Sequence, residues 1–182
     1  MLSRFFAGAL LLVAVKPLLA QQACSSLSAL SLPHTTITSA VVVPEGTAAP
    51  ARCEVQAITR PTKDSEIRLQ VWLPVSGWNG KYLQLGNGGW AGQINQTAAA
   101  DPLRLGYAVA ATDDGHQSTS PGASWAIGHP EKLIDFGYRA VHETSVQAKA
   151  ILRAFFGRDA DRSYFNGCSD GGREAHHERR PA

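Results

Sequence analysis

Ser169 is the residue with the clearest chemical potential in this sequence, and it lies in the segment Asn166–Gly172. That segment contains Gly-x-Ser-x-Gly, a pattern in which a serine sits on a sharp turn between a strand and a helix and presents its hydroxyl to a substrate carbonyl. Gly167 and Gly171 flank the serine because side chains there would collide with the neighbouring backbone. The pattern predicts a nucleophile that attacks a carbonyl carbon.

Attack on a carbonyl also requires hydrogen-bond donors for the oxyanion that develops on its oxygen. The backbone N–H of Asp170 directly follows the nucleophile and is the expected first donor. We expect the second from the loop Gly86–Gly89, which follows a short apolar run. Gly88 is the preferred donor and Gly89 the second choice, with a plain glycine turn as the alternative.

A serine nucleophile of this kind takes its acid and its histidine from later parts of the chain, but this sequence continues only to Ala182. His176 and His177 share one short segment with Ser169, whereas nucleophile and base come from different loops in such sites. Neither histidine is therefore predicted to be the base.

Other polar groupings have simpler interpretations. Asp113, Asp114 and His116 resemble a metal or acid site in isolation, but a loop capped by carboxylates after a strand is the preferred interpretation. The pair His142–Glu143 is interpreted as a packing pair on a helix, and Arg173 as a partner for an acidic neighbour. The sequence shows no zinc spacing, phosphate loop or dinucleotide fingerprint, so no metal ligand and no cofactor are predicted in this chain.

The composition excludes a strongly charged binding protein. There are 17 basic and 15 acidic residues among 182, which gives a net charge of +2. The densest basic run is Arg179–Arg180, too short to follow a phosphate backbone, so nucleic acid is not an expected partner. The length is sufficient for one domain with a core.

Residues 1–20 are predicted to be a secretory signal peptide. Arg4 supplies a positive charge, Phe5–Val15 is apolar, and Ala20 ends a cleavage site. The apolar run is too short to span a bilayer, so no membrane span is expected. We expect a secreted or periplasmic protein, in which cysteines can form disulfides. Cys24 and Cys53 lie in the same early segment and are predicted to pair, which leaves Cys168 beside the nucleophile without a partner in the chain.

Hydrophobic patterning indicates an α/β fold with a mostly parallel sheet. Strands are predicted at Val41–Val43, at Ile67–Leu73 with alternating apolar residues, at Tyr82–Leu85, at Tyr107–Ala111 and at Ser163–Phe165. A helix is predicted over Ile134–Phe156, with an apolar stripe of Val141, Ser145, Ala148, Leu152 and Phe155 and with Gly157 at its C-terminal end. Strand, helix, strand and turn follow in the order of a parallel sheet.

The last residues differ in character from the rest. Arg173–Ala175 can begin a helix, but residues 175–182 contain no large apolar side chain with which to bury a face. We therefore expect three parts: the signal peptide, a partial catalytic domain over residues 21–174, and an aberrant tail over 175–182, such as a frameshift or a premature stop would produce.

Several blocks together resemble the tannase and feruloyl esterase family. Gly-x-Ser-x-Gly alone is a moderate signal, whereas a cysteine directly before the serine, with the other blocks in the same order, is specific. The resemblance covers roughly residues 23–174. The blocks are Trp78–Lys81, Gly86–Gly92, Gly106–Ala110, Thr112–His116, Asp135–Glu143 and Tyr164–Arg173.

The resemblance implies the N-terminal part of an α/β-hydrolase whose triad runs Ser, Asp, His, with Ser169 as nucleophile. It also implies that Cys168 forms a disulfide with a cysteine beside the catalytic histidine. The Asp, the His, that cysteine and a lid domain with its calcium site are all absent from this chain, so no cofactor is expected within it.

The expected function is hydrolysis of phenolic-acid esters through an acyl-enzyme, with gallate, ferulate and terephthalate half-esters all open as substrates. One alternative is a catalytically inactive fragment or pseudogene product that lacks the triad Asp and His. A weaker alternative is a binding protein that has lost catalysis and kept a ligand cleft.

Overall fold

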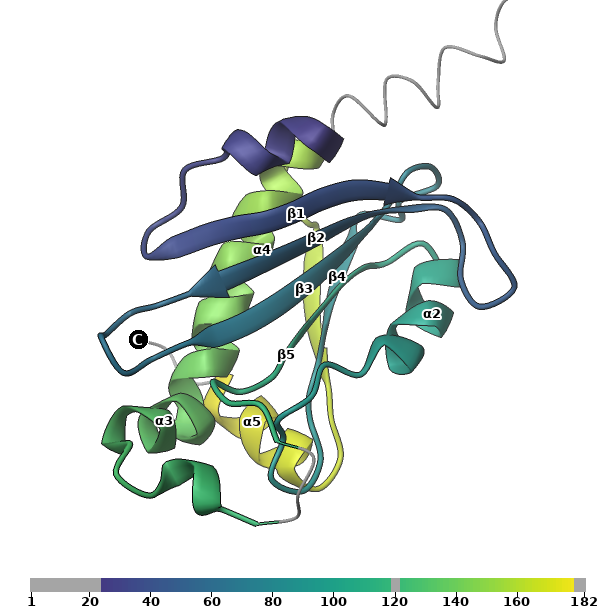
Figure 1. Ribbon diagram of the computed structural model, residues 1–182. Coiled ribbons are helices and arrows are strands. Elements are labelled where there is room, and N and C mark those ends of the chain that lie inside the picture. The colour runs from purple at the N-terminus through teal and green to yellow at the C-terminus, as the bar shows by residue number, and fades with distance from the viewer. Residues whose placement is uncertain (1–23, 119–121, 179–182) are drawn as a thin grey trace, which may run out of the picture.

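The computed structural model describes residues 24–118 and 122–178, which form a six-stranded sheet with helices on both faces (Figure 1). The strands are β1 (Thr35–Val43), β2 (Arg52–Thr59), β3 (Ile67–Pro74), β4 (Lys81–Leu85), β5 (Ala108–Thr112) and β6 (Arg162–Asn166). The helices are α2 (Gln96–Arg104), α3 (Pro130–Ile134), α4 (Ala140–Phe156) and α5 (Asp170–Glu178). Shorter helical turns are η1 (Leu27–Ala29), η2 (Ser124–Ala126) and the π-helical turn η3 (Asp135–Arg139).

The sheet is mixed, in the order β1-β2-β3-β5-β4-β6. Strands β1, β2 and β3 pair antiparallel, as do β3 and β5, whereas β5, β4 and β6 are parallel neighbours. The α/β class is confirmed, but the expectation of a mostly parallel sheet is met only by these last three strands. The difference has a local cause: the links over residues 44–51 and 60–66 are too short for the crossover that parallel neighbours need.

The chain reverses the direction in which it adds parallel strands to the sheet. From β4 the chain crosses through α2 to β5 on one side of β4, and from β5 it crosses through α3 and α4 to β6 on the other side. Because both crossovers are expected to be right-handed, the two connecting helices lie on opposite faces. Loops that follow the strands diverge at such a reversal and leave a crevice at the carboxyl edge.

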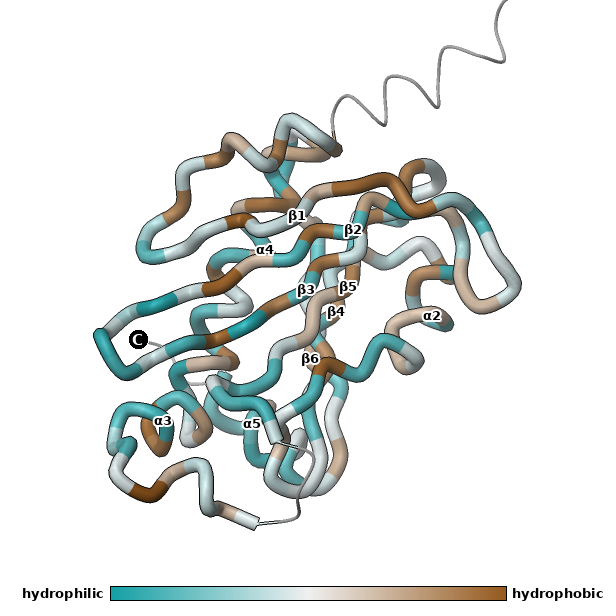
Figure 2. Tube along the Cα trace, viewed as in Figure 1, coloured by the Kyte–Doolittle hydropathy of each residue, from teal (hydrophilic) through white to brown (hydrophobic). Residues whose placement is uncertain are grey.

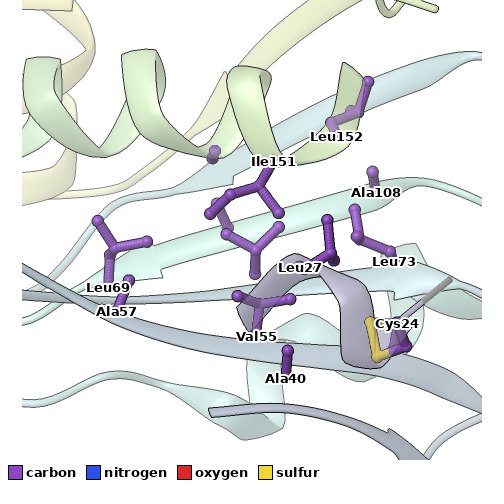
Figure 3. Close-up of a cluster of buried hydrophobic side chains, with 14 of the residues drawn as sticks. Cys24, Leu27, Ala40, Val55, Ala57, Leu69, Leu73, Ala108, Ile151 and Leu152 are labelled. Atoms are coloured by element: carbon purple, nitrogen blue, oxygen red, sulfur yellow. A yellow bond between two sulfur atoms is a disulfide. The ribbon is translucent and has the colours of Figure 1, made fainter. Parts of the chain in front are cut away.

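The larger core lies between α4 and the sheet (Figure 3). Ile151 and Leu152 of α4 pack onto Val55, Leu69 and other buried residues of the strands. The predicted apolar stripe is confirmed, because Val141, Ser145, Ala148 and Leu152 are buried and Phe155 packs against the same core. Gly157 ends the helix in the left-handed conformation, with a φ of 71°, as its position predicted.

A second apolar cluster covers the opposite face, where α2 packs against Trp72, Leu85 and Val109. Sequence analysis does not predict α2, because Pro102 interrupts its pattern. Asn95 caps the helix by accepting a hydrogen bond from the Ala98 N–H at 3.1 Å. With both faces covered, every residue of β5 is buried, as its apolar run predicted.

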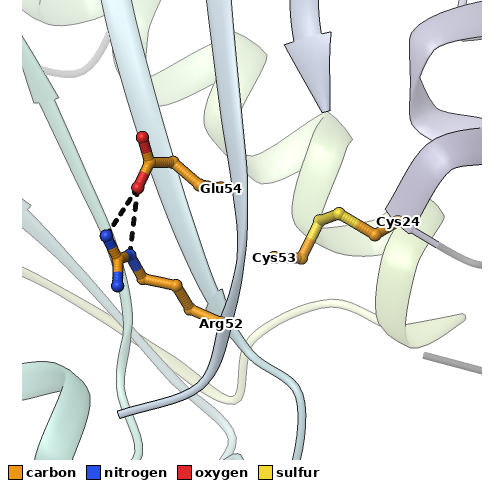
Figure 4. The surroundings of a disulfide bond; sticks show 4 residues. All are labelled: Cys24, Arg52, Cys53 and Glu54. Atoms are coloured by element: carbon orange, nitrogen blue, oxygen red, sulfur yellow. Dashed lines mark hydrogen bonds and ion pairs between the residues drawn. A yellow bond between two sulfur atoms is a disulfide. The ribbon is translucent and has the colours of Figure 1, made fainter. Parts of the chain in front are cut away.

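The predicted disulfide between Cys24 and Cys53 is present, and both residues are fully buried (Figure 4). It joins the segment before β1 to β2. On the same strand, Arg52 donates two hydrogen bonds to Glu54 and lies over the Trp72 ring. Cys168 is an exposed free thiol among the described residues, also as expected.

The sequence predicts a signal peptide at the N-terminus and a hydrophilic tail at the C-terminus. The predicted signal peptide over residues 1–20 lies outside the described residues. Within the described part of the chain, no helix has the length and apolar character needed to cross a membrane.

Helix α5 continues as far as Glu178 and is hydrophilic along its length (Figure 2). Its buried residues are Gly171 and Glu174, and none of residues 175–178 is buried.

Replacing Cys24 and Cys53 together by alanine should lower the free energy of unfolding by about 3 kcal/mol, because the bond closes a sequence separation of 29 residues. Denaturant unfolding followed by circular dichroism measures the change. Cys168→Ala is the matched control and should change stability by less than about 0.5 kcal/mol, since its thiol is exposed. A double variant as stable as the parent would contradict a structural role for the bond.

Candidate active site

Three loops meet where the parallel strands end. The loop Gly86–Gly89 follows β4, the segment Asp113–Asp114 follows β5, and the turn at Ser169 follows β6. Pairing of Leu85 with Asn166 places the ends of β4 and β6 level with each other. The carboxyl edge of the sheet therefore gathers the serine and the glycine loop that the sequence predicts as its partner.

The turn at Ser169 has the geometry expected of a nucleophile elbow. Ser169 has a φ of 58°, a left-handed conformation that a non-glycine residue seldom adopts and that concentrates at functional sites. The turn is closed by hydrogen bonds from the Gly171 N–H to the Cys168 carbonyl at 3.1 Å and from the Gly172 N–H to the Ser169 carbonyl at 3.0 Å. Strand β6 and helix α5 flank the serine directly.

Glycine is required at two positions of this turn by close backbone contact. A Cβ atom on Gly167 would lie 2.5 Å from the carbonyl group of Gly171. A Cβ atom on Gly171 would lie 2.9 Å from the carbonyl oxygen of Asn87 in the loop after β4. The predicted steric role of both flanking glycines is therefore confirmed, and Gly171 also permits contact with the predicted oxyanion loop.

Asn87 fixes that loop to the turn. Its carbonyl accepts the Gly171 N–H at 3.0 Å, and its own N–H donates to the Glu174 carboxylate at 3.0 Å. Its side-chain amide donates to the Thr112 carbonyl at 3.1 Å, which adds the end of β5. In the described part of the chain, the next N–H, that of Gly88, has no backbone acceptor. Sequence analysis missed Asn87 and Glu174, because only tertiary contact reveals their link.

An open cavity of about 850 Å³ lies between the loop, the turn and the N-terminus of α2. Gly88 and Cys168 both line it, and Gly89 is not among its lining residues. Other lining residues include Ala91, Ile94, Asn95 and Thr97. The cavity thus brings the preferred oxyanion glycine and the residue before the serine to one surface.

Arg173 pairs with an acidic neighbour, as its sequence position suggested. It donates two hydrogen bonds to Asp170, at 2.7 and 3.1 Å. The same guanidinium donates to the Gly137 carbonyl and lies over the Phe136 ring. Arg173 therefore ties the start of α5 to η3.

The segment after β5 contains buried carboxylates. Asp113 accepts hydrogen bonds from the N–H groups of Arg68 and Gly115, both at 3.0 Å, which confirms its role as a loop cap. Burial raises the pKa of Asp113 to about 7. Burial also raises the pKa of Asp114 above its ordinary value, and the nearby Glu174 raises it further.

The histidines do not gather around the serine. His116 is buried and stacks on Trp125 with ring centroids 3.8 Å apart, and burial lowers its pKa. His142 does not form the predicted pair with Glu143: its Nδ1 lies 3.8 Å from Glu178 on α5, because helical neighbours in sequence point in different directions. The described residues show no hydrogen bond between the Ser169 hydroxyl and a histidine.

Comparison with known proteins gives one consistent family. The family described as tannase and feruloyl esterase matches residues 53–179. An uncharacterized esterase of Xanthomonas campestris pv. campestris is 46% identical over 166 residues, which cover 86% of this chain and 29% of the relative. A probable feruloyl esterase B-2 of Neosartorya fischeri is 36% identical over 122 residues, covering 67% of this chain and 23% of that protein.

Solved structures agree with the sequence relatives. Feruloyl esterase B from Aspergillus oryzae superposes with a TM-score of 0.76 at 28% identity, covering 85% of this chain and 33% of the other. Tannin acyl hydrolase from Aspergillus niger gives a TM-score of 0.64 at 27% identity, covering 84% and 33%. The chain therefore spans less than a third of the length of the curated relatives it matches.

Gly167→Ala should lower the free energy of unfolding by about 2 kcal/mol, because the added methyl group meets backbone atoms that cannot move independently. Gly172→Ala is the matched control: its Cβ meets nothing within 4 Å, and alanine in a helix should add about 0.5–1 kcal/mol. Thermal or denaturant unfolding of both variants measures the contrast. Equal effects from the two substitutions would contradict the close approach described for the turn.

Proposed function

Because the chain belongs to the tannase and feruloyl esterase family, we propose that it carries the nucleophile and the oxyanion loop of a serine carboxylic-ester hydrolase. One observation carries the proposal. Ser169 occupies a strained left-handed turn at the carboxyl end of β6, and that turn is hydrogen-bonded to the glycine loop after β4. Such an arrangement favours attack on a carbonyl carbon, because it exposes the serine hydroxyl beside backbone N–H donors that are held in place.

In the proposed reaction the Ser169 oxygen attacks the ester carbonyl carbon while a histidine base accepts the hydroxyl proton. The carbonyl oxygen becomes an oxyanion, which accepts hydrogen bonds from the N–H groups of Gly88 and Asp170. The alcohol then leaves with the proton from the histidine, and water hydrolyses the acyl-enzyme by the same steps. We assign the histidine and its carboxylate to the longer protein that the relatives represent, beyond the part that this chain spans.

The proposed substrates are esters of phenolic acids. Support comes from the relatives, whose names specify feruloyl ester and tannin hydrolysis. Ferulate, gallate and terephthalate half-esters are all candidates, because the open cavity beside Gly88 and Cys168 does not distinguish among them. We also propose a secreted or periplasmic location, with which the buried disulfide is compatible.

An inactive product is the second candidate, and one feature favours it. Among the described strands, β6 pairs only with β4, and it leaves Tyr164 40% exposed at the edge of the sheet. A serine without a hydrogen-bonded histidine is also a weak nucleophile. Under this alternative, the family describes the ancestry of the chain and not its activity.

Joining the chain to the remaining part of a longer relative tests the first candidate. We would join this chain at Glu174 to the corresponding C-terminal part of the Xanthomonas relative and assay hydrolysis of methyl ferulate and methyl gallate. The fusion should turn over at least one ester, and Ser169→Ala should reduce kcat by about 10⁴-fold or more, because the nucleophile is lost. The chain alone should show no turnover.

Ser76→Ala provides the matched control, because Ser76 is an exposed serine in the loop between β3 and β4, away from the turn that holds the nucleophile. It should leave kcat unchanged within about twofold, as expected for surface substitutions. A fusion that keeps its activity when Ser169 is replaced would overturn the assignment of the nucleophile. An inactive fusion with a native circular dichroism spectrum would favour the inactive candidate.

Cys168→Ser in the same fusion should remove most of the activity. The family resemblance pairs this exposed thiol with a cysteine beside the catalytic histidine, so its loss should free the histidine loop. Mass spectrometry of peptides from the non-reduced fusion would identify the cysteine bound to Cys168. Full activity of the serine variant would contradict the proposed bridge.

A further inference from the structure

Three carboxylates converge beside the nucleophile turn. Asp114 follows β5, whereas Asp170 and Glu174 lie on α5. One oxygen from each lies within 4.8 Å of the others. Two of the three side chains, those of Asp114 and Glu174, belong to residues that are 0% exposed. The cluster therefore brings three acidic side chains together in a part of the protein from which water is largely excluded.

Asp114 is the member that the surrounding protein leaves unsatisfied. Neither of its carboxylate oxygens has a hydrogen-bond partner among the described residues. The groups that it approaches are the oxygens of the two other carboxylates, which are acceptors as well. A buried carboxylate without a donor is costly, so either a bound cation or a proton held between the oxygens must stabilise this arrangement.

The other two carboxylates have hydrogen-bond partners, but these partners do not neutralise the charge of the three carboxylates. Asp170 is paired with Arg173, which neutralises one of the three charges. Glu174 accepts the Asn87 N–H, a neutral donor. With all three carboxylates ionised, the group would keep two uncompensated negative charges. A single divalent cation would neutralise them.

We propose that Asp114, Asp170 and Glu174 bind a hard divalent cation such as Ca²⁺. Carboxylate oxygens bind Ca²⁺ at 2.3–2.6 Å, so two ligands on opposite sides of one ion are about 5 Å apart at most. All three oxygens therefore fit one coordination shell. Ca²⁺ is favoured over Mg²⁺ because it accepts bidentate carboxylates and irregular geometry, so three residues can supply much of its coordination shell, whereas Mg²⁺ demands a near-ideal octahedron.

Such an ion would join the end of β5 to the helix that follows the nucleophile. Asp170 directly follows Ser169, and Glu174 also holds the loop that contains Asn87. The site would thus stabilise the turn and the glycine loop together. It does not depend on the proposed ester hydrolysis, and it is distinct from the calcium site that the family resemblance assigns to a lid outside this chain.

Isothermal titration calorimetry of CaCl₂ into the metal-free full chain tests the proposal, with MgCl₂ and MnCl₂ as alternatives. We expect one saturable site, and a melting temperature that rises by about 5–10 °C at a hundredfold excess of cation over Kd. Asp114→Asn should weaken binding by about tenfold or more, since it removes a charged ligand. Asp170→Asn, which alters a less buried ligand, should also weaken binding.

Asp101→Asn is the matched control, because Asp101 lies on α2 with its side chain 88% exposed, and binding should not change. In EDTA, Asp114→Asn should melt at or above the temperature of the parent, because it removes a buried charge; a lost response to cation then reflects a lost ligand and not unfolding. No saturable binding by the parent chain would overturn the proposal. So would unchanged binding by both variants, and in either case a proton shared between Asp114 and Glu174 would account for the cluster.

Discussion

The contact between the nucleophile turn and the loop after β4 is the constraint on which the rest of the site depends. It is made by backbone atoms, so it requires glycine where the two segments approach: Gly171 faces Asn87, and Gly86 faces Gly171. The bonds between Gly86 and Asn166 and between Gly171 and Asn87 hold the segments together. This backbone contact positions the Ser169 turn against the loop that contains Gly88, and the Glu174 carboxylate supports it by accepting the Asn87 N–H.

The sheet positions the site by placing β4 between β5 and β6. The antiparallel strands β1, β2 and β3 supply most of the strand residues in the larger core, and the Cys24–Cys53 disulfide anchors the first segment to that core. The parallel strands supply the reversal of chain direction at which the loops separate. The antiparallel half thus supplies much of the larger core, whereas the parallel half carries the loops of the candidate site.

Periodicity and local residue types predicted the elements that obey one clear pattern. The strands near Val41, Ile67, Tyr82, Tyr107 and Ser163 and the long helix ending at Gly157 are all confirmed. Strand β2 was missed although Cys53, Val55 and Ala57 alternate with more exposed residues, because two of these three apolar side chains are small. Helix α2 was missed because Pro102 argues against a helix, and burial against Trp72 and Leu85 outweighed that local preference.

The sequence by itself determined the nucleophile turn, since the spacing of Gly167, Ser169 and Gly171 and the conformation it requires belong to consecutive residues. It also determined the disulfide, because two of its three cysteines share one early segment. Only the tertiary structure decided that Glu174 binds the Asn87 N–H and faces Asp114, and that His142 lies near Glu178. These contacts depend on the order and direction of the strands, which bring distant segments together and which no local periodicity encodes.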